Sequence, residues 1–522
     1  MRAKATVIAA VLLSALVSGG WFLQRGLSAK SGPVAGARLF DNVKAHVERF
    51  YVDSVGGTDL YEKAMAGMLQ ELHDPNTLYL KPDRVRRLEE RVTGNYAGIG
   101  VQVELRDRWP TVIGTRSATP SERAGLRTGD RIVEIDGRST HGWTADEAIK
   151  AVRGTPGTKV ELVLERPGVT EPIHVSVQRD EIHRRSVGRA SLVKDGIGYV
   201  DLNIFSDSTA IELTRAIDSL RALGMKSLIL DVRGNPGGIL AQGVGVADLF
   251  LDAKLPIVSM RGRTPETNQV FYTTGPERWP GMPLVLLVDE GSASASEIVA
   301  GALQDHDRAV LVGHSTFGKG SAQTLFPTST GGALKLTIAR WFTPAGRSID
   351  RPRHGSGDEV VTKDSTALPS FRTSHGRTVF GGGGIAPDVL AGDTVLAPAA
   401  QAFETALGSR VTDFRDAMTA YALSLKTAGS VRSPEFQVTA EMRDHLWTLL
   451  RARGFTFNRS IYDNASTIVS RLLAREIARF VFGPAAETQR SIAEDEMITK
   501  GTELLRGVAH TDELFKRAAA LK

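Results

Sequence analysis

The sequence predicts an α/β core that follows a segment of short strands and is flanked by helical segments. From Ile197 to about Val389, apolar strands such as "SLILDV" and "PLVLLVD" alternate with helical stretches. Uninterrupted apolar strands indicate a sheet that is covered on both faces. From Tyr96 to about Val177, short alternating strands lie between Gly and Pro residues, and the pattern beyond Pro398 is helical.

Composition narrows the function classes. The 522 residues allow for about three or four domains of roughly 150 residues each. The net charge is +5, and four positive charges lie in the first thirty residues, namely Arg2, Lys4, Arg25 and Lys30. The rest of the chain is therefore near neutral and shows no nucleic-acid footprint. The absence of cysteine excludes disulfides, thiolate metal sites and a cysteine nucleophile.

The first thirty residues resemble a membrane or export segment. After a short basic start, the run from Ala5 to Leu23 is uncharged and mostly apolar, and its nineteen residues are close to the length that spans a bilayer as a helix. We expect an uncleaved anchor with its positive end in the cytoplasm and the body of the protein outside. A long cleaved signal peptide is the alternative, although "GLSA" is a poor cleavage site.

Several helices can be placed from their start and stop signals. The pattern from Arg38 to about Arg91 is helical and is broken by the turn in "LHDPNTLYL". Thr144 and Glu147 form a capping box that opens a helix ending at Gly154. The stretch "STAIELTRAIDSLRALG" predicts a further helix that ends at Gly224, within the α/β region.

The stretch "VDEGSASASEIVAGALQD" places three serines at alternate positions before an apolar helix. Ser294 and Glu297 have the spacing of a capping box, which by itself explains the pattern. The alternative is that Ser292, Ser294 or Ser296 is a nucleophile at the helix N-terminus. The stretch alone favours capping, so the choice depends on the rest of the chain.

Two further features follow core strands. In "LILDVRGNPGG", a buried strand leads into a turn where Gly237 and Gly238 leave bare backbone N–H groups near a helix start. In "STFGKGSAQT", Lys319 lies between two glycines in an otherwise uncharged segment. A partly buried lysine has a lowered pKa and can accept a proton, whereas an exposed one is an ordinary loop residue.

A serine hydroxyl needs an adjacent base to act as a nucleophile. Histidine is the usual partner, but His306, His314 and His375 do not lie in a convincing strand-end turn, although His314 is only five residues before Lys319. A serine–lysine pair is a known alternative. Ser294 precedes Lys319 by 25 residues, which is the length of one helix and one strand, so both return to the same edge of an α/β sheet.

The motifs "SASASEIVAGALQD" and "TFGKGSAQT" together resemble the C-terminal processing (tail-specific) serine protease family. The resemblance implies that Ser294 is the nucleophile, Lys319 the general base and Gln323 the residue that orients the lysine. It also implies a crotonase/ClpP-like α/β protease core with an inserted PDZ domain, and no metal or cofactor. The similarity runs from about Leu39 to Leu390 and includes "TPAGRSI" and "GGIAPDV".

The same resemblance implies an oxyanion hole made of backbone N–H groups. One donor is Ala295, which follows the nucleophile. The second comes from the Gly-Gly turn, where both Gly237 and Gly238 remain candidates.

The stretch "AGLRTGDRIVEIDG" is similar to a PDZ domain. "YAGIGVQV" takes the place of the loop that binds a peptide carboxylate, with Gly98, Ile99, Gly100 and Val101 as the binding residues. The two glycines free the backbone to hold a peptide C-terminus while the peptide adds a strand to the sheet edge.

We therefore predict an exported serine endopeptidase that recognises and cleaves protein substrates near their C-termini. The expected domains are an anchor or signal (1–30), an N-terminal segment (31–91), a PDZ segment (92–180), a core segment (181–397) and a helical tail (398–522). The tail has no interpretable motif, so packing, homo-oligomer formation and adaptor binding all stay open. The alternatives are a non-catalytic PDZ scaffold on a degenerate core and a Ser-His esterase that uses His314.

Overall fold

The structure is a computed structural model that describes residues 33–116, 118–351, 368–392 and 397–521. The chain forms two compact units: one holds residues up to Asp83 with Gln323–Thr337, and the other holds Arg84–Ala322 with the chain from Ile338 onward. The predicted anchor over residues 1–30 lies outside the described residues. Among the residues described, no helix is both long and apolar enough to cross a bilayer.

The first unit contains the helices expected in the N-terminal segment. They are α2 (Pro33–Phe50) and α3 (Gly57–Gln70). The turn after α3 leads into a short strand that the sequence did not predict, β1 (Leu78–Leu80). It pairs antiparallel with Ala333–Lys335 at the start of β18 (Ala333–Phe342). Asp74 holds this turn because its carboxylate accepts the Asn76 N–H at 2.9 Å and the Thr77 hydroxyl at 2.6 Å.

The PDZ segment contains a sheet in the order β3-β4-β5-β7-β8, with β6 paired to β5. Strand β3 is therefore an edge strand. The Thr144–Glu147 capping box is confirmed and opens helix α6. The elements that follow β1 along the chain, up to the end of this segment, are α4 (Pro82–Thr93), β2 (Asn95–Gly98), β3 (Val101–Arg106), β4 (Trp109–Thr115), α5 (Pro120–Arg123), β5 (Arg131–Ile135), β6 (Arg138–Ser139), α6 (Ala145–Val152), β7 (Lys159–Glu165), β8 (Ile173–Gln178) and β9 (Asp180–His183).

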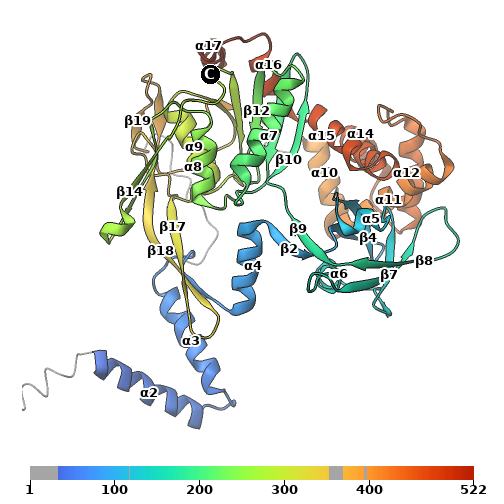
Figure 1. Ribbon diagram of the computed structural model, residues 1–522. Coiled ribbons are helices and arrows are strands. Elements are labelled where there is room, and N and C mark those ends of the chain that lie inside the picture. The colour runs from blue at the N-terminus through green and yellow to red at the C-terminus, as the bar shows by residue number, and fades with distance from the viewer. Residues whose placement is uncertain (1–32, 117, 352–367, 393–396, 522) are drawn as a thin grey trace, which may run out of the picture. The chain divides into compact units, whose positions relative to one another are not determined.

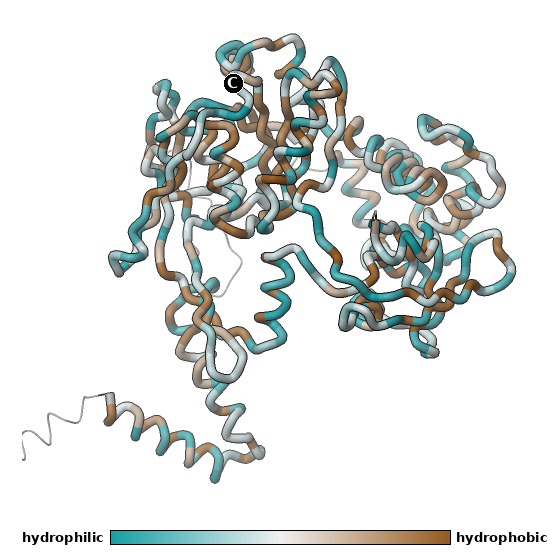
Figure 2. Tube along the Cα trace, viewed as in Figure 1, coloured by the Kyte–Doolittle hydropathy of each residue, from teal (hydrophilic) through white to brown (hydrophobic). Residues whose placement is uncertain are grey.

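The core segment is built on a sheet in the order β10-β11-β12-β15-β16-β21. Within this sheet, strands β11, β12, β15, β16 and β21 run parallel to one another. Strand β10 forms one edge and runs antiparallel to β11. Helices α7, α8 and α9 pack on one face of this sheet in the largest hydrophobic cluster (Figures 1 and 2). The bounds are β10 (Val187–Leu192), β11 (Ile197–Leu202), α7 (Thr209–Ala222), β12 (Ser227–Asp231), α8 (Leu240–Asp248), β15 (Leu284–Val288), α9 (Ala295–Asp305), β16 (Val310–Gly313) and β21 (Val389–Leu390).

Further strands lie outside the parallel sheet. Strand β13 pairs antiparallel with β14 and with the end of β18. Strands β19 and β20 form a separate hairpin. The bounds are β13 (Pro256–Gly262), η2 (Pro265–Thr267), β14 (Gln269–Tyr272), β17 (Ser321–Pro327), β18 (Ala333–Phe342), β19 (Ser370–Arg372) and β20 (Thr378–Phe380).

The described part of the tail consists of helices joined by loops, as predicted. Its earlier helices form a hydrophobic cluster of their own. Its last two helices instead pack on the second face of the parallel sheet, so both faces are covered as expected. The bounds are α10 (Pro398–Leu407), η4 (Gly408–Arg410), α11 (Val411–Ala428), α12 (Ala440–Ala452), α13 (Arg459–Asn464), α14 (Ser466–Ile477), η5 (Ala478–Phe482), α15 (Pro484–Ala493), α16 (Glu496–Leu505) and α17 (Thr511–Ala519).

Close packing between α16 and the sheet depends on a glycine. A Cβ atom at Gly501 would lie 3.2 Å from the Ile229 side chain and 3.3 Å from the Val285 side chain. A side chain at this position would be tight against both strands, so glycine suits the close approach of the helix. Covering the second face is thus one packing role of the helical tail.

Candidate active site

The candidate site lies at one edge of the parallel sheet. Strands β12, β15 and β16 are neighbours and run in the same direction. The glycine turn (residues 232–238) follows β12, the serine turn (residues 289–294) follows β15, and the lysine loop (residues 314–320) follows β16. All three segments therefore start from the carboxyl ends of adjacent strands, where sites form in open α/β sheets.

The backbone of Ser294 is held in an unusual conformation. Its φ is +56° and its ψ is −111°, a region that residues with a side chain rarely adopt. Such conformations persist when surrounding bonds impose them, and they are frequent at functional sites. Ser294 is half-buried, whereas Ser292 and Ser296 are fully buried.

The two flanking serines use their hydroxyls to hold the turn. The Ser292 hydroxyl donates to the Val232 carbonyl at 2.8 Å, and the Ser296 hydroxyl donates to the Asn235 carbonyl at 2.9 Å. The first bond joins the serine turn, and the second joins the first turn of α9, to the glycine turn that follows the neighbouring strand.

Glu297 joins the serine turn to the lysine loop. One oxygen of its carboxylate, Oε2, accepts the backbone N–H of Ser294 at 2.8 Å and that of Lys319 at 3.0 Å. The other oxygen, Oε1, accepts the Thr316 hydroxyl at 2.6 Å and the Gly318 N–H at 2.7 Å. The Ser294 bond is the carboxylate half of the predicted capping box, and the bonds to the lysine loop were not foreseen.

The Glu297 side chain is fully buried. Burial raises the pKa of its carboxyl, and the four hydrogen bonds, which favour the ionised form, offset only part of that rise. All four partners are donors. The site therefore demands an acceptor on both oxygens, which only a carboxylate provides.

The glycine turn packs directly against the serine turn. A Cβ atom at Gly237 would lie 2.8 Å from both Ser294 Cβ and the Ala295 nitrogen, so no side chain fits there. The φ of Gly237 is +89°, which also favours glycine. The Asn235 carbonyl accepts the Ala293 N–H at 3.0 Å. The Gly237 N–H donates to the Asn235 side-chain oxygen at 2.9 Å.

Arg233, in the same turn, was not singled out from the sequence. It lies between Asp231, at 2.6 Å, and Asp495 of the helical tail, at 3.0 Å. Burial alone would lower the pKa of Arg233, but its hydrogen bonds with Asp231 and the charges of both carboxylates raise it overall. Asp495 also accepts the Ile498 N–H at 3.0 Å as the N-cap of α16. The helical tail thus contacts the glycine turn through this ion pair.

Gln323 lies on β17 in the first compact unit. Its Nε2 donates to the Thr337 hydroxyl at 3.3 Å. Its predicted role in orienting the lysine stays a prediction. His314 follows β16, and its backbone N–H donates to the Val288 carbonyl at 3.0 Å. Within the described residues, no hydrogen bond joins the His314 ring to the serine turn.

The loop at the start of the PDZ segment has the constraints expected of a backbone binding loop. Gly100 has a φ of +79°, and a Cβ atom there would lie 2.4 Å from Thr119 Cβ. The Ile99 side chain is almost fully buried, and Val101 begins the edge strand β3. Gly98 ends β2 and is also buried. The loop therefore leads directly into the edge strand of the sheet.

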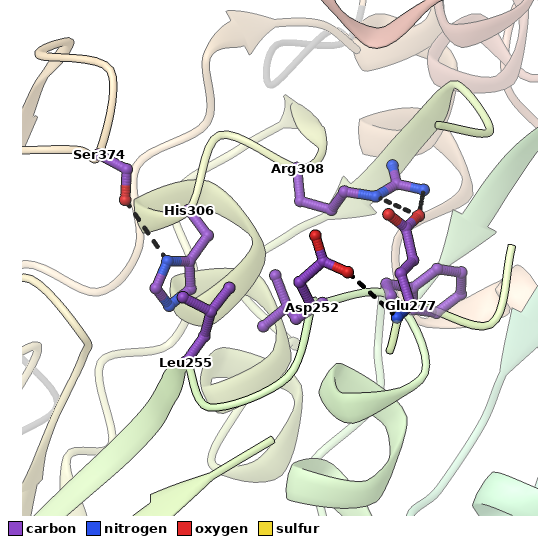
Figure 3. A pocket seen from close by; sticks show the side chains of 8 residues that line it. Asp252, Leu255, Glu277, His306, Arg308 and Ser374 are labelled. Atoms are coloured by element: carbon purple, nitrogen blue, oxygen red, sulfur yellow. Dashed lines mark hydrogen bonds and ion pairs between the residues drawn. The ribbon is translucent and has the colours of Figure 1, made fainter. Parts of the chain in front are cut away.

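A small cavity of about 230 Å³ lies elsewhere in the core segment (Figure 3). His306, at the C-terminal end of α9, contributes to its lining, together with Arg308, which forms an ion pair with Glu277. Ser294 is at the opposite end of the same helix. This cavity is therefore separate from the candidate site.

Two family models match segments of this chain. Peptidase family S41 matches residues 196–357, and a PDZ domain matches residues 114–166. The carboxy-terminal processing protease CtpA of Bacillus subtilis is 35% identical over 349 residues, which are 66% of this chain and 73% of that protein. The carboxy-terminal-processing protease of Bartonella bacilliformis is 38% identical over 314 residues, 59% of this chain and 71% of that protein.

Among solved structures, a photosystem II D1 C-terminal processing protease is 29% identical and covers 60% of this chain and 89% of its own, with a TM-score of 0.35. The relatives at 35% and 38% identity define the class of this protein as a serine-type peptidase. The chain belongs to the carboxy-terminal processing protease family, with a PDZ domain, as its sequence motifs predict.

Glu297→Gln tests the bridge between the serine turn and the lysine loop. The amide nitrogen of glutamine must face two N–H or O–H donors, so buried groups lose their acceptor at about 1–3 kcal/mol each. We expect a lower melting temperature and a peptidase rate reduced by at least about 10-fold. Glu290→Gln, the same change at an exposed position, is the control. Equal rates for wild-type and Glu297→Gln would mean that Glu297 is only a helix cap.

Proposed function

We propose that this peptidase uses a serine–lysine centre, with Ser294 as nucleophile and Lys319 as general base, to cut protein substrates near their C-termini. The observation that carries the proposal is the Glu297 carboxylate, which accepts the backbone N–H groups of both residues on one oxygen. The backbones of the proposed nucleophile and its base are thereby bonded to the same carboxylate oxygen.

The hydrogen bonds of the serine turn favour Ser294 over its neighbours. Ser292 and Ser296 donate their hydroxyls to carbonyls of the glycine turn and are fully buried. Ser294 is half-buried and adjoins the glycine turn. It is therefore the serine of the three that a substrate can reach.

The reaction follows from these positions. The Ser294 hydroxyl attacks the scissile carbonyl while the neutral Lys319 amine takes its proton. The oxyanion is stabilised by the N–H of Ala295 and by one N–H of the glycine turn. The protonated lysine returns the proton to the leaving amine, and water then hydrolyses the acyl-enzyme. In this scheme Gln323 orients the lysine amine.

The second oxyanion donor is either Gly237 or Gly238. The Gly237 N–H already donates to the side chain of Asn235, so its use requires that Asn235 releases it when substrate binds. Gly238, with a φ of +156°, packs against the Phe205 carbonyl. Both stay candidates.

The rival interpretations fit less well. A non-catalytic scaffold would not need Ser294, Lys319 and Gln323 to be present together. A Ser-His esterase would need the His314 ring beside the serine turn. We also propose the domain boundaries given above, with the PDZ segment as the part that captures substrate tails. Oligomer or adaptor contacts of the helical tail stay predictions.

Ser294→Ala should abolish peptide cleavage while leaving the melting temperature nearly unchanged, because the loss of a helix cap costs only about 0.5–2 kcal/mol. Ser292→Ala and Ser296→Ala should keep measurable turnover on an unstructured protein, followed by gel electrophoresis. Cleavage by Ser294→Ala at the wild-type rate, or loss of activity in Ser292→Ala alone, would contradict the assignment.

Capture of a substrate tail should depend on its terminal carboxylate. In the full chain carrying Ser294→Ala, amidation of a peptide should weaken its binding clearly, as measured by calorimetry. Gly100→Ala should do the same, because the new Cβ atom would overlap Thr119. Gly125→Ala is the matched control, since Gly125 has a φ of +80° but open space around it. Equal affinity for acid and amide would remove the carboxylate-capture role.

Export and anchoring are further proposals, carried by the apolar run from Ala5 to Leu23. The full-length protein should fractionate with membranes and resist extraction by high salt, whereas a chain that begins near Ser31 should be soluble. A mature N-terminus found at or after Lys30 by N-terminal sequencing would instead establish a cleaved signal peptide.

A further inference from the structure

Strand β3 begins at the proposed carboxylate-binding loop (residues 98–101). Along its outer edge, the backbone N–H and carbonyl groups of alternate residues can pair with an added strand. Leu105 lies opposite Pro110 on β4, and Pro110 has no N–H. These two residues cannot form a hydrogen-bonded pair, so the N–H and carbonyl of Leu105 face away from β4. The direction of the backbone groups alternates from one residue to the next along a strand. The N–H and carbonyl of Val103, two residues before Leu105, therefore also face away from β4.

The partners of Val112 agree with this orientation. Val112 lies opposite Val103 on β4. Its N–H donates to the Asp130 carbonyl and its own carbonyl accepts the Gly129 N–H, both at 2.8 Å. Its backbone groups thus point to the far side of β4. Beyond the loop of residues 98–101, a peptide that adds to β3 would pair first with Val103 and then with Leu105.

The helical tail occupies the Leu105 position. Arg415, on α11, donates from Nη2 to the Leu105 carbonyl at 3.3 Å, and Arg106 donates to the same carbonyl at 3.2 Å. Nη1 of Arg415 pairs with Glu104 at 3.2 Å. The carbonyl that an added strand would use at this point is already hydrogen-bonded.

Neighbouring contacts hold α11 at this place. The next residue, Asp416, accepts the Asp107 N–H at 3.0 Å, and Arg106 donates to the Thr419 hydroxyl at 2.9 Å. Arg453, beyond α12, pairs with the Asp107 carboxylate at 2.6 Å. Arg106 itself is buried. The β3–β4 turn is thus fastened to the helical tail by several bonds.

We propose that the helical tail sets how much of a substrate tail the PDZ segment reads, by ending the pairing edge of β3 at Leu105. This inference rests on the proposed capture of C-termini. With the carboxylate held at residues 98–101, an antiparallel peptide places about four residues along β3 before the Leu105 position. Residues further upstream leave the edge and make no backbone bond with it.

The test is a backbone N-methylation scan of one eight-residue peptide with a free carboxylate. Binding is measured by calorimetry to the full chain carrying Ser294→Ala. Methylation at the third residue from the C-terminus, opposite Val103, should weaken binding about 10-fold. Methylation at the fifth residue and further upstream should change it less than 2-fold. A loss of similar size at the fifth residue would overturn the inference while leaving tail capture intact.

Two variants check that Arg415 is the cause. Arg415→Ala removes one donor from the Leu105 carbonyl, so methylation at the fifth residue should begin to weaken binding. Arg453→Ala breaks an ion pair of the same interface without touching β3, and should keep the wild-type pattern. If methylation at the fifth residue weakens binding in both variants, or in neither, the role of Arg415 is overturned. A peptide that does not bind at all would contradict the proposed function itself.

Discussion

The candidate site depends on one buried carboxylate with four donors. Glu297 sits in the first turn of α9, yet three of its four partners come from the loop after the next strand. Burying a charge is costly unless every oxygen is hydrogen-bonded, and here both oxygens are. The same contacts that offset the cost of burial fix the backbone of Ser294 in a conformation that the residue would not adopt alone.

The parallel sheet makes this arrangement possible. Adjacent strands deliver the glycine turn, the serine turn and the lysine loop to one edge, so short hydrogen bonds can tie them together. Gly237 permits the close approach of the glycine turn to the serine turn, because any side chain there would overlap Ser294. The helical tail supports the sheet from its second face and, through Asp495 and Arg233, also reaches the glycine turn. Its other helices fasten the β3–β4 turn.

Local signals in the sequence predicted much of the fold. The apolar strands, the Thr144–Glu147 capping box and the helical tail are patterns of neighbouring residues, and the structure confirms them. Strand β1 was missed because its three residues pair with a strand some 250 residues away. A three-residue strand has no periodicity to detect, so only its distant partner defines it.

In the candidate site, too, the sequence did not reveal contacts between segments that are distant along the chain. The spacing of Ser294 and Glu297 predicted a cap, but the bonds from Glu297 to the lysine loop arise from the adjacency of β15 and β16, which spacing does not encode. Arg233 and Asn235 were part of a motif in the sequence, and their partners could be named only from the fold. The covering of the second sheet face by α16 and α17 could not be foreseen, because their sequence carries no sign of the surface they meet.

The central claim is that Ser294 is acylated during turnover. The most direct measurement is mass spectrometry of the wild-type enzyme quenched in acid during the cleavage of an activated peptide ester. Fragmentation of the acylated peptide assigns the acyl group to a single residue. The account predicts that this residue is Ser294, and that Ser292 and Ser296 carry no acyl group. An acyl group on another residue, or turnover with a kinetic burst but no acyl group on Ser294, would contradict it.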